Sequence, residues 1–231
     1  MKLNHLPPLV LLLVVILGCS QLRDAAMQGG SDGNAANANA SLEGDGSGSS
    51  ETSAGVAPSG DPVLDINRMA DAFLAQTSFR AKMVGSGQTP VNMELEFVAP
   101  DRFRIKNSNG PEMVIVGKNV YLEHEGRWQK MPGDLGASVP DMRKAWDEEG
   151  RKWFTDVKYV GEDTANGKPA HVYTYHNKGA EGVGENDSKI WIGKSNGLPV
   201  RIEANYKKGT LRSMTIDYDY DANISIESPV K

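Results

Sequence analysis

The residue best placed to do chemistry in this 231-residue chain is its single cysteine, Cys19. It follows an unbroken apolar run, residues 9–17, and one small residue, Gly18. Lys2 supplies a positive charge ahead of that run, which is too short to cross a bilayer as a helix. A positively charged N-terminus, a short apolar core and a small residue before the cleavage site are typical of a secretory signal. We therefore predict cleavage between Gly18 and Cys19.

The thiol of Cys19 then has a specific chemical use. A cysteine directly after such a signal resembles the bacterial lipobox, in which the thiol receives a diacylglycerol and the new amino terminus is acylated, for example with palmitate. The resemblance implies a covalent lipid on Cys19 that holds the protein to a membrane, since two or three chains anchor stably at roughly 0.8 kcal/mol per buried methylene. The plainer alternative is a buried thiol or an unpaired redox residue.

Two further features bear on where the protein resides. Ser20, directly after the cysteine, resembles the lipoproteins sent to the outer membrane of Gram-negative bacteria. The predicted location is therefore the bacterial cell envelope, with the lipid anchor in the outer membrane and the domain facing the periplasm. Because the sequence holds no second cysteine, the exported domain must fold without disulfides.

Composition divides the chain into three parts. Residues 19–60 consist mainly of Gly, Ser, Asn and Ala, and they cannot bury enough apolar surface to offset their ordering entropy. Most of the net charge of −5 also belongs to this segment. We predict a lipoprotein signal over 1–18, a lipidated cysteine and flexible acidic tether over 19–60, and one compact domain over 61–231.

The domain should begin with an amphipathic helix of about 15 residues. Asp61 can cap its first turn, and Pro62 suits the first helical position, where a missing N–H costs nothing. A second, shorter helix is predicted within residues 132–150, ending at Gly150. The apolar residues at helical spacing in the first helix are Ile66, Met69, Ala70, Phe73 and Leu74.

After the first helix the hydrophobic period changes from 3.6 to 2. In residues 91–97 every odd position is apolar and every even position is polar, which is typical of a half-buried antiparallel strand. Short connections with turn residues predict that neighbours in sequence pair in the sheet. The predicted strands are 78–88, 91–97, 102–106, 112–117, 119–123, 127–131, 156–161, 170–176, 189–193, 199–206 and 211–220, with 223–227 as an optional twelfth.

These elements predict a mainly β fold with helices (α+β). A curled antiparallel meander of about 11 strands should form an unclosed half-barrel. The N-terminal amphipathic helix and the second short helix should cover its concave side.

The apolar face of this sheet is the candidate lining of a lipid cavity. Each residue taken alone is better explained as plain core, because alternating apolar residues need no ligand. The functional hypothesis concerns the set: where strands outnumber what the helices cover, a cavity remains that something apolar should fill. The candidate lining residues are Ile66, Met69, Phe73, Met93, Leu95, Phe97, Phe103, Ile105, Ile115, Leu122, Val172, Ile190, Ile192, Val200, Ile202 and Ile216.

Several strings across residues 62–228 also carry a family resemblance. They are 97–104 (FVAPDRFR), 113–117 (MVIVG), 119–121 (NVY), 127–132 (RWQKMP), 190–193 (IWIG) and 197–203 (GLPVRIE). Together they resemble the superfamily of the lipoprotein carriers LolA and LolB and their lipoprotein relatives LppX and LprG. The resemblance implies an unclosed β-barrel whose concave face holds acyl chains. LolA is a soluble shuttle, whereas the predicted anchor on Cys19 argues against a freely diffusing carrier.

Enzymatic function is not predicted. The histidines His124, His171 and His176 lack the spacing of metal ligands, the sequence holds no phosphate loop, and no cysteine beyond Cys19 remains for nucleophilic chemistry. The acidic strings 147–149 and 217–221 lack the layout of an EF-hand. An acidic chain without a basic stripe argues against nucleic acid as a partner. We expect no catalytic residue, no metal and no cofactor beyond the covalent lipid and a bound acyl chain.

Two sets of residues have open alternatives. The tryptophans could lie at the mouth of a cavity or pack in an ordinary core. A basic row could meet phosphate head groups, or form a solvated face balanced by acidic residues across a hairpin. The tryptophans are Trp128, Trp146, Trp153 and Trp191; the basic row is Arg102, Arg104 and Lys106, and its acidic neighbours are Glu94 and Glu96.

The leading hypothesis is a membrane-anchored lipoprotein of the cell envelope whose half-barrel binds or transfers lipid or the acyl chains of lipoproteins. The alternative is an anchored structural or interaction module with a solid core that contacts an envelope protein. A cavity beneath the first helix would favour the first hypothesis, and a packed interior would favour the second.

Overall fold

The computed structural model describes residues 56–138, 142–179 and 184–230. The predictions for the signal, for Cys19 and for nearly all of the tether lie outside these residues. No helix among the described residues is both long enough and apolar enough to cross a membrane.

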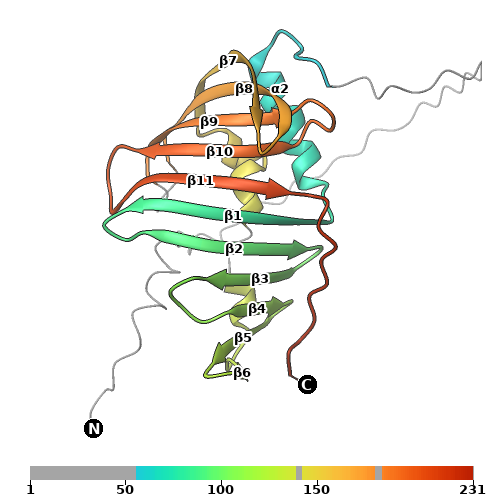
Figure 1. Cartoon of the computed structure of the whole chain (residues 1–231), viewed down its shortest axis with the longest axis vertical. Coiled ribbons are helices and arrows are strands. Elements are labelled where there is room, and N and C mark those ends of the chain that lie inside the picture. The colour runs from blue at the N-terminus through green and yellow to red at the C-terminus, as the bar shows by residue number, and fades with distance from the viewer. Residues whose placement is uncertain (1–55, 139–141, 180–183, 231) are drawn as a thin grey trace, which may run out of the picture.

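The described residues form eleven strands in one antiparallel sheet, as predicted (Figure 1). The burial pattern of the first strand follows the expected alternation, with Phe79, Ala81 and Met83 buried. The strands are β1 (Ser78–Gly87), β2 (Val91–Val98), β3 (Arg102–Asn107), β4 (Met113–Val116), β5 (Asn119–His124), β6 (Arg127–Lys130), β7 (Phe154–Ala165), β8 (Lys168–Asn177), β9 (Asn186–Gly193), β10 (Pro199–Tyr206) and β11 (Leu211–Asp219).

The strands form two meanders joined in the middle of the sheet. Their order is β6-β5-β4-β3-β2-β1-β11-β10-β9-β8-β7, so β1 pairs with β11 while β6 and β7 lie at opposite edges. In the central pairing, Met83 lies opposite Ile216. The sheet is therefore open, and the connection from β6 to β7 must cross from one edge to the other.

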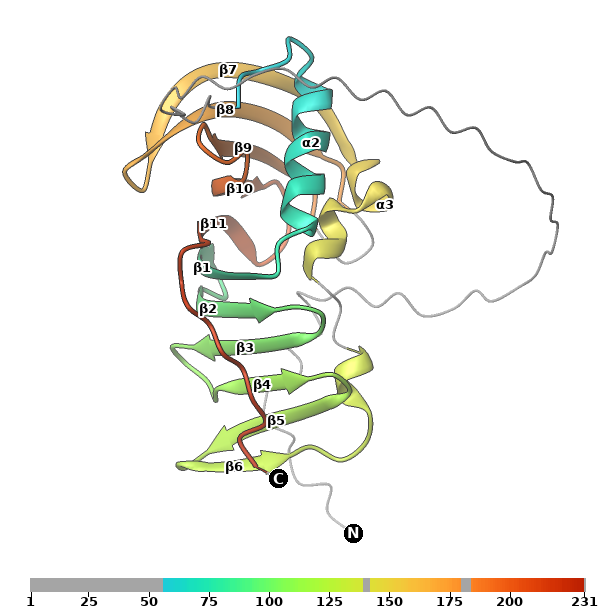
Figure 2. The ribbon, with the colours of Figure 1, turned by 90° about the vertical axis from the view of Figure 1, so that its right-hand side faces the viewer.

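The predicted first helix is α2 (Pro62–Leu74), with Asp61 as its N-cap. The Asp61 carboxylate accepts hydrogen bonds from the backbone N–H groups of Val63 (2.9 Å) and Leu64 (3.3 Å). The helix buries the predicted apolar stripe against the inner face of the sheet. Figure 2 shows β7 to β10 arching around α2.

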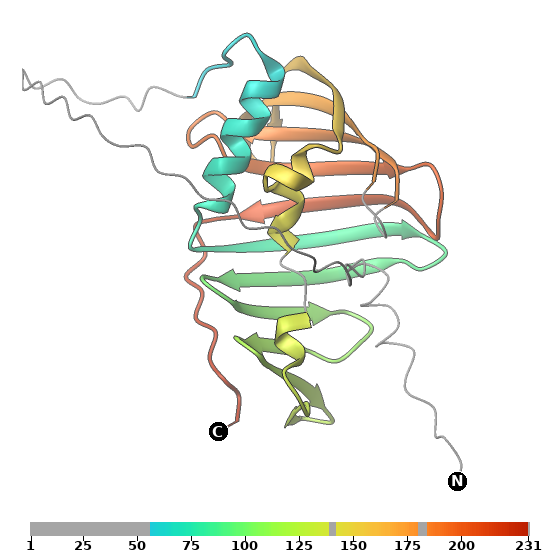
Figure 3. The same cartoon turned by 180° about the vertical axis from the view of Figure 1, so that it is seen from behind.

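The crossing connection contains short helical turns rather than the single predicted helix. They are the 3-10 helices η1 (Leu135–Ser138) and η2 (Met142–Trp146) and the α-helix α3 (Glu148–Arg151). Gly150 lies inside α3 and does not end it. A Cβ at this position would lie 2.4 Å from the backbone oxygen of Lys144, so the glycine permits α3 to pack closely on η2. Figure 3 shows η2 and α3 beside α2 over the inner face.

The predicted twelfth strand, 223–227, is wrong. The segment has no strand partner; it runs from β11 along the outer face past β3 to β5 (Figures 1 and 2). Side chains hold it instead of a backbone ladder: the guanidinium of Arg102 donates to the backbone oxygen of Ile226 (2.9 Å), and that of Arg104 donates to the backbone oxygen of Ser225 (3.3 Å). Buried Ile226 packs with Val114 and Tyr121 on that face.

Candidate functional site

The inner face beneath α2 is a packed aromatic and aliphatic core. Phe73 of α2 lies 5.1 Å from Phe79 of β1 and 5.4 Å from Tyr218 of β11, measured between ring centroids. Phe79 in turn lies 5.2 Å from Phe97 of β2. The side chains that meet here are almost fully buried, so α2 is seated on a filled interior.

A buried carboxylate fixes the start of α2 to the sheet. Tyr173 of β8 donates its hydroxyl to Asp65 (2.8 Å), and the backbone N–H of Ser59 donates to the same carboxylate (3.0 Å). Burial by itself would raise the pKa of Asp65, but the hydrogen bonds from Ser59 and Tyr173 outweigh burial and hold it below 3.8. Asp65 is therefore ionised at neutral pH and joins α2 to β8.

The connection from β6 to β7 holds α2 from its other side. Arg151 of α3 forms an ion pair with Asp71 of α2 (2.9 Å) and donates to the backbone oxygen of Asn67 (3.1 Å). At the border of the packed core, the guanidinium of Arg143 lies 4.0 Å from the centroid of the Phe97 ring. Polar contacts therefore surround a helix whose underside is apolar.

Beyond α2, the apolar inner face continues across β2 to β5. The strand register aligns Leu95, Ile105, Met113 and Leu122 in one row. Leu95 is buried, whereas the other members of this row are half-buried. Figure 2 shows that α2 lies over β7 to β11 and ends near β1 and β2; beyond it, the short turn η1 lies over part of the inner side of β3 to β5 (Figure 3). This second half of the inner face is the candidate functional site.

Most of the predicted lining residues do lie on the inner face. Two do not: Val172 and Val200 pack in a separate cluster with Trp191. Val172 alternates with Tyr173 of the main core and so points to the opposite face. A register shift between Pro199 and Arg201 displaces Val200 from the expected alternation.

The remaining lining residues fall into two groups by exposure. Those beneath α2 and in the adjoining core are buried, as is Ile115 of β4, and those at the margin of α2 or elsewhere on β3 to β5 are half-buried. The buried group is Ile66, Met69, Phe73, Leu95, Phe97, Ile115, Ile190, Ile192 and Ile202. The half-buried group is Met93, Phe103, Ile105, Leu122 and Ile216.

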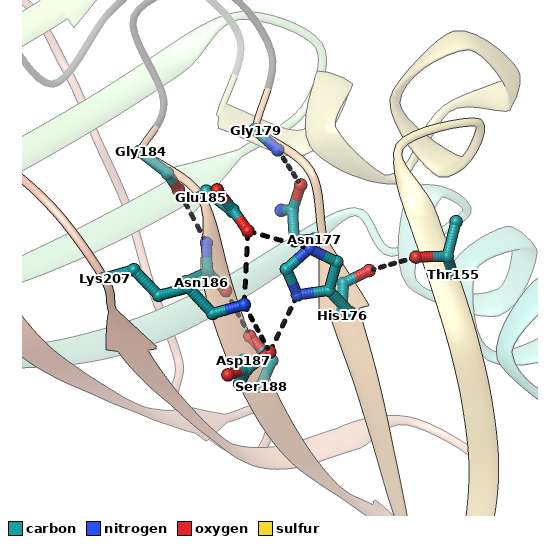
Figure 4. Close-up of polar contacts among 10 residues, drawn as sticks. All are labelled: Thr155, His176, Asn177, Gly179, Gly184, Glu185, Asn186, Asp187, Ser188 and Lys207. Atoms are coloured by element: carbon teal, nitrogen blue, oxygen red, sulfur yellow. Dashed lines mark hydrogen bonds and ion pairs between the residues drawn. The ribbon is translucent and has the colours of Figure 1, made fainter.

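The outer face carries a polar groove of 560 Å³ over β7 to β10. His176 lines it and lies at the centre of the polar contacts in Figure 4, with its Nδ1 2.7 Å from Asp187 and its Nε2 3.3 Å from Glu185. Lys207 approaches Glu185 at 3.2 Å. The contact with His176 holds the pKa of Asp187 below its usual range, and Lys207 acts in the same direction. The groove's charges are thus already partly neutralised within the fold.

A second groove of 400 Å³ lies on the same outer face beside the C-terminal segment, lined by residues that include Arg104, Trp128 and Ser228. Both grooves lie outside the space beneath α2. Among the residues that the structure describes, no group of three or more His, Cys, Asp or Glu side chains could hold a metal ion.

One member of the basic row, Arg104, belongs to an ion-pair network on the outer face. Glu96 is buried between Arg80 (2.6 Å) and Arg104 (2.9 Å), confirming the predicted balance across the hairpin for this pair. Burial would raise the pKa of Glu96, but both arginines outweigh it and hold the pKa below 4.5. Arg102 and Arg104 also bind the C-terminal segment, a role that the sequence pattern did not reveal.

The tryptophans have different environments. Trp146 is buried in the inner core, where its ring centroid lies 5.3 Å from that of Phe154. Trp191 is buried on the outer face, and its indole N–H donates to Asp163 (3.1 Å). Trp128 is half-buried next to the C-terminal segment, and Trp153 is exposed. Trp146 and Trp191 therefore serve as ordinary core residues.

No protein-family model and no curated protein matches this sequence. Its fold is similar to the crystal structure of the Mycobacterium tuberculosis lipoprotein LppX, with a TM-score of 0.52 and 12% identity over 74% of this chain and 100% of that chain. It is also similar to LprF from Mycobacterium bovis, with a TM-score of 0.55 and 14% identity over 75% of this chain and 99% of that chain. The predicted resemblance is thus confirmed at the level of the fold.

Proposed function

We propose that this protein is a lipid-anchored lipoprotein of the bacterial cell envelope that binds an acyl chain, of a lipid or of another lipoprotein, without catalysis. The observation that carries the proposal is the continuation of the apolar inner face past the end of α2, across β3 to β5. The fold shared with the lipoprotein LppX supports it. The proposal retains the anchor at Cys19 and the outer-membrane location that Ser20 favours.

The inner face beyond α2 has the chemistry that an acyl chain requires. Ile105, Met113 and Leu122 present half-buried aliphatic and thioether surface in one row, without a charged side chain among them. An acyl chain lying along this row would remove surface from water on both sides, at about 0.8 kcal/mol per buried methylene. Because the core beneath α2 is filled, the chain would bind beside the helix rather than beneath it.

Uptake of a fluorescent fatty acid by the purified protein tests this proposal. We expect wild-type protein to bind the probe, and Ile105→Asp or Leu122→Asp to weaken binding at least tenfold. The matched control is Val84→Asp on the outer face, where Val84 is 47% exposed, and it should bind like wild type. Circular dichroism confirms that each variant is folded. A lipid-free wild-type protein in native mass spectrometry that also takes up no probe would contradict the proposal.

A second candidate function, an anchored interaction module, is favoured by the filled core beneath α2 and by the polar groove on the outer face. In that case a protein partner would contact side chains such as Lys158 and Lys189, which line the groove. A photo-crosslinking residue at position 158 would then yield a protein adduct in cells. The same residue at position 105 would yield a lipid adduct if the first proposal holds.

A further inference from the structure

One end of the molecule carries exposed apolar side chains from two elements. In the first turn of α2, Val63 is 51% exposed and Leu64 is 40% exposed. In the middle of β7, Tyr159 is 41% exposed and Val160 is 59% exposed. We call these four residues the end patch. Apolar side chains this exposed gain little from the packing of their own domain, so four at one end suggest an external contact.

The two halves of the end patch are joined through one tyrosine. Asp65, the residue after Leu64, accepts the hydroxyl of Tyr173 at 2.8 Å. The ring of Tyr173 lies 5.2 Å from that of Tyr159, measured between centroids. The first turn of α2 and the middle of β7 also lie at the same end of the molecule in all three ribbon views (Figures 1, 2 and 3).

The strand in the end patch, β7, has an irregular edge that disfavours pairing with another strand. β7 is an edge strand, but its register shifts between Thr155 and Lys158 and again between Tyr159 and Gly161. The second shift leaves Val160 as an extra residue without a partner on β8. Bulges of this kind interrupt the hydrogen-bonding edge and prevent edge-to-edge association. An added strand from a second chain therefore fits the end patch poorly.

The position of the tether favours a bilayer as the occupant. The described chain enters α2 at Asp61, at the same end as the patch, and Cys19 lies about 40 residues earlier. A flexible segment of that length has a reach of about 35 Å. An anchor on Cys19 would thus keep this end of the domain within contact distance of the membrane. Tyrosine and aliphatic side chains together match the membrane interface, where an apolar body and a polar tip are both accommodated.

We propose that the end patch of Val63, Leu64, Tyr159 and Val160 docks the domain directly on the lipid bilayer surface. This proposal rests on the lipid anchor of the proposed function, but not on acyl-chain binding by the inner face. Docking would set the first turn of α2 and the edge of β7 against the head groups. The sheet would then stand away from the membrane, with the inner face open at its side.

The experiment uses the lipidated full chain in vesicles of phosphatidylcholine. Because lipid consumes the thiol of Cys19, the variant Val160→Cys carries one free thiol, which can be labelled with an environment-sensitive fluorophore. Val84→Cys, on the outer face, is the matched control. A shallow spin-labelled phosphatidylcholine should quench the label at position 160 several-fold more than the label at position 84. Adding Val63→Asp and Leu64→Asp should remove that difference while the protein still floats with the vesicles.

Each result that would contradict the docking proposal points to a different cause. Equal quenching at positions 160 and 84 in protein that floats with the vesicles would overturn docking and leave the anchor intact. Protein that does not float would overturn the anchor and docking together. Quenching between labelled copies without quenching by lipid would assign the end patch to a second copy of this chain. Fatty-acid uptake by the inner face is measured separately, so its failure is distinguishable from each of these results.

Discussion

Asp65 shows how one buried carboxylate can hold a helix on a sheet. It accepts hydrogen bonds from Tyr173 of β8 and from the backbone of Ser59, which precedes the helix. Glu96 has a corresponding role on the outer face, between Arg80 and Arg104. Both carboxylates are buried and both are fully partnered, so their removal leaves polar groups without partners.

We expect Asp65→Asn to lower the free energy of unfolding at pH 7 by about 1–3 kcal/mol, because an amide accepts these hydrogen bonds less well than a charged carboxylate. Chemical denaturation monitored by circular dichroism measures the loss. The control Tyr173→Phe removes only one donor and should cost about 1 kcal/mol. A stability of Asp65→Asn equal to that of wild type would show that the contact with Tyr173 does not hold the helix.

The stability of the protein should also fall in acid through Glu96. Its pKa is depressed in the folded state, so the stabilisation is complete above the ordinary value of 4.5 and is lost as the pH falls through the folded value. We expect Glu96→Gln to destabilise the protein by about 2 kcal/mol at pH 7, since the two arginines are partly exposed and screened. The variant should lose less stability than wild type between pH 5 and pH 3. If the stability of wild type and of Glu96→Gln fell equally over this pH range, protonation of Glu96 would not be a cause of the loss in acid.

At the scale of elements, the C-terminal segment stabilises the half of the sheet that α2 does not reach. It is held by Arg102 and Arg104 of β3, and Ile226 is buried against Val114 and Tyr121. The helix covers one half of the sheet on its inner face, and this segment covers part of the other half on its outer face. The inner side of β3 to β5 therefore belongs to a part of the sheet that is packed on its outer face.

We expect Ile226→Ala to lower the free energy of unfolding by about 2–4 kcal/mol, since it removes a fully buried aliphatic side chain. Ile224→Ala is the matched control, because Ile224 belongs to the same segment but is only half-buried. Thermal unfolding of both variants measures the difference. Equal losses would indicate that the segment packs loosely and does not fix the position of β4 and β5.

How far the sequence predicts the fold depends on the kind of signal. Period-2 alternation located the strands, as in residues 91–97, and the Asp61-Pro62 pair located the start of α2 within one residue. The same alternation could not assign faces where both sides of a strand are apolar, which is why Val172 was placed on the inner face. The role of Asp65 and the path of residues 223–227 depend on partners more than 100 residues away, and no local pattern encodes them.

At the scale of the whole molecule, α2 covers one half of the apolar inner face, and half-buried apolar side chains remain on β3 to β5. Under the two proposals, this second part takes an acyl chain and the end patch contacts the bilayer surface. The proposed lipid on Cys19 would bring both features to a membrane. The proposed binding function therefore depends on a residue far from the domain in sequence.

We expect Cys19→Ser to remain unlipidated and to lose stable attachment to membranes, because the serine hydroxyl does not replace the thiol as the acceptor of diacylglycerol. Metabolic labelling with a radioactive fatty acid, followed by membrane fractionation, measures both effects. Cys19→Ser should still show the fatty-acid uptake of the inner face once it is purified. Label on the serine variant equal to that on wild type would refute the anchor.

The pairing of β1 with β11 determines when this protein can finish folding. β1 begins at Ser78 and β11 begins at Leu211, so during synthesis the central strand emerges long before its partner. A nascent or truncated chain that stops before Leu211 lacks β11. The edge of β1 then keeps unpaired backbone hydrogen-bonding groups beside an exposed apolar face. We expect such chains to be bound by holding chaperones or cut by proteases. Folding of each copy can therefore finish only once the last strand of the sheet has been made.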